Sequence, residues 1–428
     1  MAVIKTLRSV RYNERILAHA ENLMAPPYDV ISPDDQELYY DLSPFNVIRL
    51  ILGKEFPDDT EGKNRYTRAR EFLENWMRDG ILAQDDSPSV YGYSQVYRDS
   101  AGQARKRDGF VALLRLEEWG AGDVFPHEHT YSGPKADRLK LLRATGHQLS
   151  CIFSLYSDPE QATARIVDTI VGSPEVTRYT DRGGVEHILT RCTDTAVHEG
   201  LIAAMRDKKV FVADGHHRYE TMLAFRAEMR EKGAAGDAHD YVLVYFVPLE
   251  GDAITILPCH RIVEIDGPPD EEDAVRLMSE AFSVETFEKG GEGTTRFIQA
   301  LERKGKGSLG FYPGGDRYFL LSDPDDRTIG RFFPPDMKDE IRGLDVSILH
   351  HVVIAGLLSI RSPRFTYSHD AREALDRAVW GKYMAFIFNA TMIEEVKAAS
   401  LIGERMPQKS TFFYPKPASG LVFYRVVT

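Results

Sequence analysis

One stretch constrains the fold of this chain more than any other: VFVADGHHRYETMLAFRAEM, residues 210–229. It begins with an apolar run of strand length and breaks at Asp214-Gly215. It then continues with apolar residues at the three- and four-residue spacing of an amphipathic helix. A strand followed directly by a helix is the repeating unit of proteins in which helices pack on the faces of a sheet.

Strand-like and helix-like segments alternate on both sides of this stretch, and 428 residues suffice for more than one hydrophobic core. We therefore predict a mixed α+β protein with mixed sheets, flanking helices and several domains. The Pro-rich segment EIDGPPDEED at 264–273 is the clearest expected domain edge. The expected parts are an N-terminal α/β segment at 1–118, a central α/β domain with the main motifs at 119–268, and a C-terminal α/β domain at 269–428.

The composition of the chain indicates which kinds of partner to expect. The formal net charge of −12 argues against a general attraction to nucleic acids or anionic membranes, so we expect small-molecule ligands and leave a homo-oligomer open. The three cysteines are too far apart for a metal knuckle, which favours a reducing compartment. The chain has no signal-like apolar segment and no run of about 18 apolar residues, so we expect a cytoplasmic protein.

The junction DGHHR has the chemistry of an anion site. The first turn of a helix presents backbone N–H groups and a partial positive charge, and His216, His217 and Arg218 add donors there. Gly215 allows a sharp turn or a close approach to a ligand. Asp214 either caps the helix or holds a metal or hydroxyl group. The plainer alternative is a capped helix whose exposed first turn is polar.

A second polar cluster lies in HEHTYSGPKADRL, at residues 127–139. Glu128 is the best candidate for a general base, with His127 beside it as a further catalytic candidate. Lys135 and Arg138, on a helix expected after the Gly-Pro turn, are suited to neutralise phosphate charge. His127 and His129 resemble metal ligands, although HEH is not the HExxH spacing of a helical zinc site. A charged surface loop is the plainer interpretation.

A third stretch, MAPPYDVIS at 24–32, is stiffened by two consecutive prolines. This rigidity either directs Asp29 at a substrate or simply ends a strand, and the sequence does not decide between the two.

Several motifs together resemble a family of bacterial and archaeal proteins of unknown function, DUF1015. They are APPYDVIS, HEHTYSGPKADRLKLL, FVADGHHRYETML, LDVSILHHVV and MPQKSTFFYPKPASGLV, in this order. The DGHHR segment alone is also similar to the phosphate-contacting motif of the ParB/sulfiredoxin-like superfamily, which implies a central part of that fold. The superfamily includes nucleotide-hydrolysing partition proteins, sulfiredoxins and kinases of free serine.

The superfamily resemblance implies phosphate contacts at Gly215, His216, His217 and Arg218. The sulfiredoxin motif contains a cysteine that this chain lacks, and no basic helix-turn-helix follows the motif as it does in partition proteins. The resemblance therefore implies nucleotide-linked chemistry on a small molecule, with a free amino acid such as serine as acceptor.

Three hypotheses follow, and they assume that the polar clusters converge. The first is a phosphotransferase or nucleotide hydrolase that uses Mg²⁺ with ATP or another nucleotide, with Glu128 or Asp29 deprotonating a small hydroxyl-bearing acceptor. The second is a metal-dependent hydrolase or lyase. Its candidate ligands are His127, His129, Asp214 and His216 or His217. The third is a nucleotide sensor that binds without turnover.

Overall fold

The computed structural model describes residues 1–99, 102–265, 267 and 271–427. Its chain forms two compact units. The first unit comprises Met1–Pro126, Thr130–Thr255 and Pro415–Thr428, and the second comprises His127–His129 and Ile256–Tyr414. The three-part division stays a prediction. Its boundary at 268/269, and much of the Pro-rich edge around it, lie outside the described residues.

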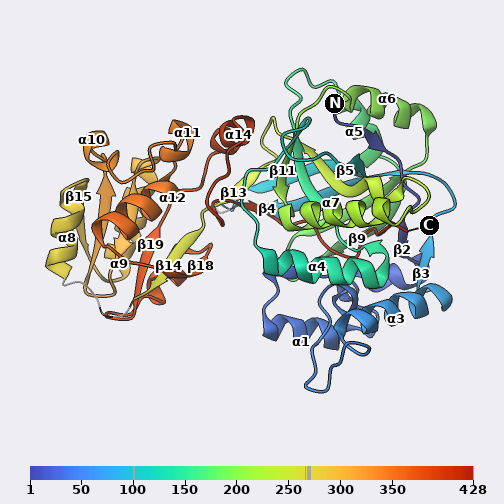
Figure 1. Cartoon of the computed structure of the whole chain (residues 1–428), viewed down its shortest axis with the longest axis horizontal. Coiled ribbons are helices and arrows are strands. Elements are labelled where there is room, and N and C mark those ends of the chain that lie inside the picture. The colour runs from blue at the N-terminus through green and yellow to red at the C-terminus, as the bar shows by residue number, and fades with distance from the viewer. Residues whose placement is uncertain (100–101, 266, 268–270, 428) are drawn as a thin grey trace. The chain divides into compact units, whose positions relative to one another are not determined.

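A nine-stranded mixed sheet forms the centre of the first unit (Figure 1). The strand order is β6-β11-β8-β12-β5-β4-β10-β9, and β1 also pairs with β5. The pairs β6/β11 and β8/β12 are parallel and the other neighbours are antiparallel. The strands are β1 (Ile4–Lys5), β4 (Val90–Arg98), β5 (Ala104–Arg115), β6 (Val124–Phe125), β8 (Ile152–Tyr156), β9 (Glu175–Thr180), β10 (Glu186–Cys192), β11 (Val210–Asp214) and β12 (Tyr241–Pro248).

The central strands of this sheet are apolar on both faces. In β12 every residue from 242 to 247 is buried, and Phe246 lies opposite Phe110 of β5 with their rings stacked at 5.0 Å. A strand without a polar face needs cover on both sides. Helices supply this cover, so the prediction of mixed sheets with flanking helices is confirmed.

Helix α7 packs against β8, α4 lies alongside α7, and α3 packs against α4 (Figure 1). Helix α5 packs against β4, β5 and β10, and α6 against α5. The α-helices of this unit are α1 (Pro33–Leu42), α2 (Ile48–Ile51), α3 (Arg65–Arg78), α4 (Ser132–Thr145), α5 (Ala164–Val171), α6 (Thr195–Met205) and α7 (His216–Glu231). Short 3-10 segments are η1 (Glu14–Asn22), η2 (Tyr28–Val30) and η3 (Ala238–Asp240).

Two small ribbons complete the first unit. They pair β2 (Val10–Tyr12) with β3 (Leu82–Gln84), and β7 (His147–Gln148) with β21 (Tyr424–Arg425). The second ribbon attaches the end of the chain to this unit. A third ribbon pairs β13 (Thr255–Leu257), where the chain passes into the second unit, with β20 (Phe412–Tyr414).

The second unit is built on a six-stranded antiparallel sheet of order β15-β17-β16-β19-β14-β18. Alternate residues enter two separate cores: Phe319 and Leu321 of β17 join one, and Tyr318 and Leu320 the other. This alternation places apolar layers on both faces of the sheet. The strands are β14 (His260–Glu264), β15 (Ser283–Glu288), β16 (Leu309–Tyr312), β17 (Arg317–Ser322), β18 (Arg364–Ser368) and β19 (Tyr383–Ile387).

Helices complete both cores. One core contains residues of α8 and of a π-helical segment, and the other contains residues of α9 and α13. The helices are α8 (Glu271–Ser279), α9 (Gly291–Lys304), α10 (Asp326–Ile329), α11 (Asp339–Arg342), α12 (Asp345–Ser347), the π-helix η4 (Ile348–Leu357), α13 (Ala371–Asp376) and α14 (Ile393–Leu401). Within the described ranges, no helix has the length and apolarity needed to cross a bilayer.

Candidate functional site

The polar junction after β11 forms as the sequence predicts. β11 ends at Asp214, Gly215 has φ 96° and ψ 27°, and α7 begins at His216. A Cβ atom at position 215 would lie 3.0 Å from the guanidinium of Arg218, and the positive φ would strain any side chain. Glycine therefore serves both the turn and the close approach of Arg218.

Asp214 holds two cations from distant parts of the chain. Its Oδ2 accepts a hydrogen bond from Nη2 of Arg218 at 2.5 Å, and its Oδ1 accepts one from Nζ of Lys416. The three side chains are only 9 to 11% exposed. The N-cap of α7 is Gly215, so Asp214 acts as an anion shared by two cations, a role that the sequence did not indicate.

Arg218 is held further by the segment before β8. Its Nη1 donates to the carbonyl oxygen of Cys151 and, at 3.3 Å, to Oγ of Ser150. The guanidinium thus lies fixed at the start of α7, within one turn of the N-terminal N–H groups. His216, next to the turn, is buried as well.

Arg138 of α4 packs against the APPYD turn. Its guanidinium lies 3.9 Å from the ring centroid of Tyr28, and its Nη1 donates to the carbonyl oxygen of Ile51 at 2.7 Å. Its Nε donates to Asp137 at 2.7 Å. Asp29, the next residue after Tyr28, is exposed.

The pKa of Tyr28 shows how these charges are grouped. Burial raises it to about 12, and the nearby carboxylates Asp29 and Asp214 add to the rise. The cations Arg138 and Arg218 oppose it. Tyr28 therefore lies within electrostatic reach of both arginines, so APPYD, PKADR and DGHHR come together in the first unit.

Lys135 has a more specific partner than the sequence indicated. Its Nζ donates to Oε2 of Glu220 at 2.9 Å, and the same carboxylate accepts from Oγ1 of Thr130 at 2.6 Å and Nε1 of Trp119 at 3.0 Å. Burial alone would raise the pKa of Glu220, but these donors outweigh it and lower the pKa to about 2. Glu220 lies one helical turn after His216 on α7, and sequence reasoning did not single it out.

The start of α4 also differs from the expectation. The helix begins at Ser132, so Gly133 and Pro134 lie inside its first turn instead of preceding it. Proline is tolerated there because first-turn N–H groups have no partner within the helix. Just before the helix, the backbone N–H of Tyr131 donates to Nε2 of His217 at 2.9 Å, which joins the two helix starts.

The segment His127–His129 belongs to the second unit. His127 is buried, with Nε2 2.9 Å from Oγ1 of Thr411, and Oε1 of Glu128 accepts the backbone N–H of Lys409 at 3.1 Å. His129 is exposed. The catalytic roles of Glu128 and His127 depend on convergence with the first unit, and they stay predictions.

Among the residues that the structure describes, no group of three or more His, Cys, Asp or Glu side chains is arranged to hold a metal ion. The candidate ligands His129 and Asp214 therefore do not belong to a ready-made set of that kind. The cysteines Cys151, Cys192 and Cys259 are buried thiols that form no disulfide with one another.

A cavity of 220 Å³ lies beside Lys416. One part of its wall is the turn at Ala25 and Pro26, and another is the strand edge with Tyr179 and Asp181. The full lining is Glu21, Met24, Ala25, Pro26, Tyr39, Tyr179, Asp181, Arg182, Gly183, His187, Lys416 and Ala418. We refer to it as the Lys416 cavity.

A buried histidine organises the strand side of the Lys416 cavity. Nε2 of His187 lies 3.0 Å from Oδ2 of Asp181, and its Nδ1 lies 2.7 Å from the hydroxyl of Tyr93. The ring of Tyr179 stacks on it at 4.9 Å, and the buried hydroxyl of Tyr179 has no hydrogen-bond partner among the described residues. Sequence reasoning missed all four residues. The one available signal was the inward position of His187 in the alternating strand EHILTRC.

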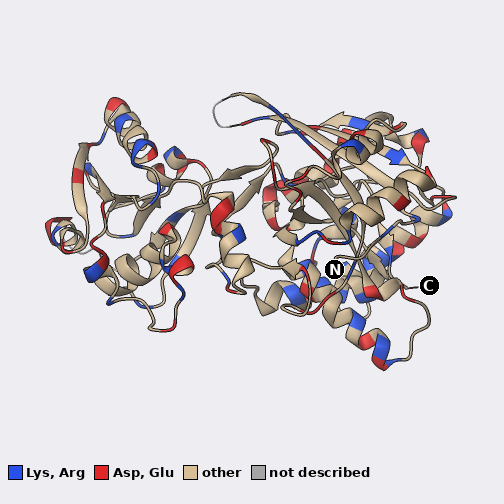
Figure 2. Ribbon diagram, turned by 90° about the horizontal axis from the view of Figure 1, so that it is seen from above, with Lys and Arg blue, Asp and Glu red and all other residues tan. Residues whose placement is uncertain are grey.

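A second, smaller cavity lies beside Arg218. Arg138 and Arg218 line it together with apolar residues, which include Leu141, Leu149 and Met222. Both arginines therefore line one small cavity, whereas Lys416 lines the larger one. Figure 2 shows that elsewhere along each unit acidic and basic residues are interspersed.

Comparison with known proteins places this architecture in a family. The model of the family described as protein of unknown function (DUF1015) matches residues 4–347, and the chain belongs to that family. No curated protein sequence matches it.

Solved structures with a partial likeness include a free serine kinase and two other proteins. A mutant of the kinase in complex with ADP is 14% identical, with a TM-score of 0.34 over 70% of this chain and 89% of the other. A conserved hypothetical protein from Pyrococcus furiosus is 13% identical, with a TM-score of 0.34 over 71% and 92%. SbnI from Staphylococcus aureus, with a C-terminal truncation, is 11% identical, with a TM-score of 0.37 over 73% and 86%.

Proposed function

We propose that the protein is a phosphotransferase or nucleotide hydrolase that binds nucleotide phosphates at the start of α7. One observation carries the proposal: Arg218 and Lys416, from distant segments, share Asp214 at the N-terminus of a 16-residue helix, and Arg138 lines a small cavity together with Arg218. Helix N-termini and arginine side chains are the groups that proteins use to bind phosphate. The Gly215, His216 and His217 backbone completes this site.

In this proposal the phosphate group competes with Asp214 for Arg218 and Lys416. The carboxylate keeps the two cations in place in the free protein. A phosphate oxygen entering at the helix start takes over one or both pairs, and Lys416 can then follow it toward the Lys416 cavity that it lines. Catalysis of phosphoryl transfer consists largely of positioning and of neutralising negative charge, which these residues supply.

Mg²⁺ fits this arrangement as a companion of the nucleotide. The ion needs only one or two protein carboxylates when phosphates supply other ligands. Asp214 already pairs with two cations, whereas exposed Asp29 forms no ion pair within the described part of the chain and adjoins the arginine cluster through Tyr28. Asp29 is thus the better candidate for the ion or for the base. Glu128 remains the alternative base.

The Lys416 cavity is the proposed acceptor site. Its volume of 220 Å³ suits a small metabolite, because pockets for drug-sized ligands are about 300–1,000 Å³. The hydroxyl of Tyr179 and the carboxylate of Asp181 offer a donor and an acceptor to a hydroxyl-bearing compound. A free amino acid such as serine is one member of that class.

The first test is thermal unfolding with ATP, ADP, CTP and GTP, each with and without Mg²⁺. A ligand at 100 times its dissociation constant stabilises the native state by about 2.7 kcal/mol. We expect one nucleotide to raise the melting temperature, and Lys416→Gln to abolish the shift. Lys140→Gln, an exposed position on α4, is the matched control. No shift with any nucleotide would contradict the proposal.

A turnover assay distinguishes an enzyme from a nucleotide sensor. ATP labelled at the γ-phosphate should lose its label to water or to an added hydroxyl-bearing metabolite, and Asp29→Asn or Glu128→Gln should slow this loss. Binding with no product over many hours would instead favour a sensor. Activity that disappears with a chelator, without any nucleotide shift, would favour the metal-dependent hydrolase.

A further inference from the structure

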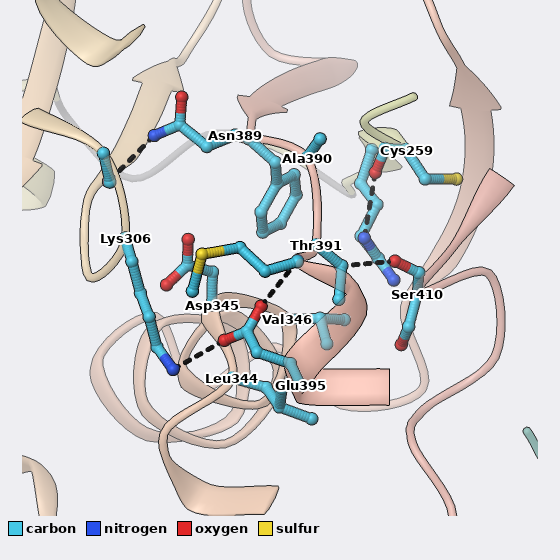
Figure 3. Close-up of a pocket in the computed structure, with 14 residues that line it drawn as sticks. Cys259, Lys306, Leu344, Asp345, Val346, Asn389, Ala390, Thr391, Glu395 and Ser410 are labelled. Carbon is cyan, nitrogen blue, oxygen red and sulfur yellow. Dashed lines mark hydrogen bonds and ion pairs between the residues drawn. The ribbon is translucent and has the colours of Figure 1, made fainter. Parts of the chain in front are cut away.

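A separate cavity of 180 Å³ lies within the second unit (Figure 3). One side is formed by Arg261 on β14 and Ser410, and another by Asp345 at the start of α12 and Glu395 of α14. This volume lies below the range of about 300–1,000 Å³ for pockets of drug-sized ligands, so the cavity is too small for a nucleotide. The nucleotide proposal does not involve this cavity.

The basic side of the cavity carries a buried charge that forms no ion pair within the described part of the chain. Arg261 is 1% exposed, and its guanidinium donates to the carbonyl oxygens of Cys259 at 3.0 Å and of Gln408 and Lys409 at 3.2 Å each. Its Nε has no hydrogen-bond partner among the described residues. Burial lowers the pKa of Arg261, while Cys259, Tyr367 and Glu128 act in the opposite direction.

The surroundings of Arg261 keep this charge in place. Its guanidinium lies 5.0 Å from the ring centroid of Phe388, which also lines the cavity, and 5.7 Å from that of Tyr367. Aromatic faces attract a cation but do not neutralise it. A buried cation without a carboxylate is costly, and an anionic ligand would remove this cost.

The acidic side of the cavity has an excess of negative charge. Lys306 pairs with Glu395 at 2.6 Å, as Figure 3 shows, and this leaves Asp345 as a second carboxylate beside one lysine. Oδ1 of Asp345 accepts the backbone N–H of Gly307 at 2.9 Å. Burial raises the pKa of Asp345 to about 6, Glu395 adds to the rise, and the Gly307 N–H and Lys306 oppose it. A ligand cation would relieve this repulsion.

Neutral polar side chains of the cavity wall form hydrogen bonds within the protein. Thr391 donates to the carbonyl oxygen of Ser410 at 2.7 Å, and the amide of Asn389 donates to the carbonyl oxygens of Leu301 and Gly305 at 3.1 and 2.8 Å. These bonds fix the wall and leave the two charged sides as the features that would select a ligand. A compound with one negative and one positive group matches both.

We propose that this cavity binds a small zwitterionic metabolite of the α-amino acid class, whose carboxylate pairs with Arg261 and whose ammonium group pairs with Asp345. The two pairs neutralise charges that the protein itself leaves unbalanced. Recognition of both groups would also exclude simple carboxylates and simple amines, since each would leave one buried charge unpaired.

The test is isothermal titration calorimetry of the full chain with the common L-amino acids as probes. For each amino acid that binds, the analogue without the amine and the analogue without the carboxylate are titrated next. For alanine these are propionate and ethylamine. We expect at least one amino acid to bind, and both of its analogues to bind at least tenfold more weakly.

Substitutions in the cavity test whether the amino acid binds there. Asp345→Asn and Arg261→Gln should each weaken the amino acid at least tenfold, whereas Asp323→Asn and Arg364→Gln should not, because those side chains are 66 and 83% exposed. Near-ultraviolet circular dichroism checks folding. If the buried Arg261 variant fails to fold, the half-buried Asp345 variant and the analogue series decide.

Three results would overturn the proposal. The first is no binding of any amino acid at millimolar concentration. The second is an analogue without the amine or without the carboxylate that binds as tightly as the amino acid itself. The third is unchanged binding by Asp345→Asn, which would place the amino acid elsewhere, for example in the Lys416 cavity.

Discussion

Replacing Asp214 by Asn should destabilise the first unit and at the same time strengthen its response to phosphate. The carboxylate is shared by Arg218 and Lys416, and the three side chains are 9 to 11% exposed. Removing one partner of a buried ion pair costs about 3–5 kcal/mol. The amide oxygen of Asn keeps one hydrogen bond, worth about 1 kcal/mol, so we expect a loss of about 2–4 kcal/mol. The variant leaves two cations without their shared anion, and phosphate can replace it.

Urea unfolding, followed by tryptophan fluorescence, can isolate this effect. Trp76 and Trp119 belong to the first unit, and the ring of Trp119 stacks on Tyr219 of α7 at 4.2 Å. Trp380, in the second unit, is 44% exposed, so a Trp380→Phe background removes its signal at little cost. The titration is run with and without inorganic phosphate.

The matched control is Asp240→Asn, which removes a pair with Arg230 that is 54% exposed on the arginine side. Exposed pairs contribute about 0–1 kcal/mol, so this variant should change little. A loss below about 1 kcal/mol in the Asp214 variant would refute the buried-pair argument. Equal stabilisation of both proteins by phosphate would refute the idea that phosphate replaces the carboxylate.

Three further predictions concern neighbouring residues. Glu220 has its pKa lowered to about 2 from an ordinary 4.5, so it stabilises the fold above pH 4.5 and this contribution is lost as the pH falls toward 2. Glu220→Gln should therefore lower the free energy of unfolding by about 3 kcal/mol at pH 7. In urea titrations from pH 6 to 3, the stability of the variant should fall less steeply with pH than that of the unmodified protein. Equal slopes for the two proteins would count against this prediction. Gly215→Ala should cost about 1–3 kcal/mol and abolish nucleotide binding, since the strained backbone and the new Cβ displace Arg218; unchanged thermal shifts would contradict this. Tyr179→Phe removes a hydroxyl that has no hydrogen-bond partner among the described residues, so stability should stay within about 0.5 kcal/mol while KM for the acceptor rises. An unchanged KM would remove Tyr179 from the acceptor site.

Local patterns in the sequence were sufficient to predict the elements of the site but not its partners. The β11 to α7 junction follows from an apolar run, a glycine and helical spacing, all within 20 residues. Lys416 lies 202 residues from Asp214 along the chain, and nothing in either local sequence indicates the pair. Sequence proximity was also misleading: Thr130 contacts Glu220 in the first unit, whereas His127 is bonded to Thr411 in the second. Spatial partners of polar residues are set by the return of distant strands and helices, which residue patterns do not encode.

The charge balance of the site leads to a last prediction, on magnesium. Arg138, Arg218 and Lys416 are accompanied by Asp137 and Asp214, so the group carries a formal charge of +1. A nucleoside triphosphate carries several negative charges, more than this surplus and the start of α7 can neutralise. Mg²⁺ bridges phosphate oxygens and removes two of those charges. The Mg²⁺ complex of ATP should therefore bind at least tenfold more tightly than free ATP, while inorganic phosphate should bind with little dependence on Mg²⁺. Calorimetric titrations of both ligands, with magnesium and with a chelator, measure this contrast. Equal affinity for ATP with and without the ion would mean that further cations, beyond the three in this group, reach the phosphates.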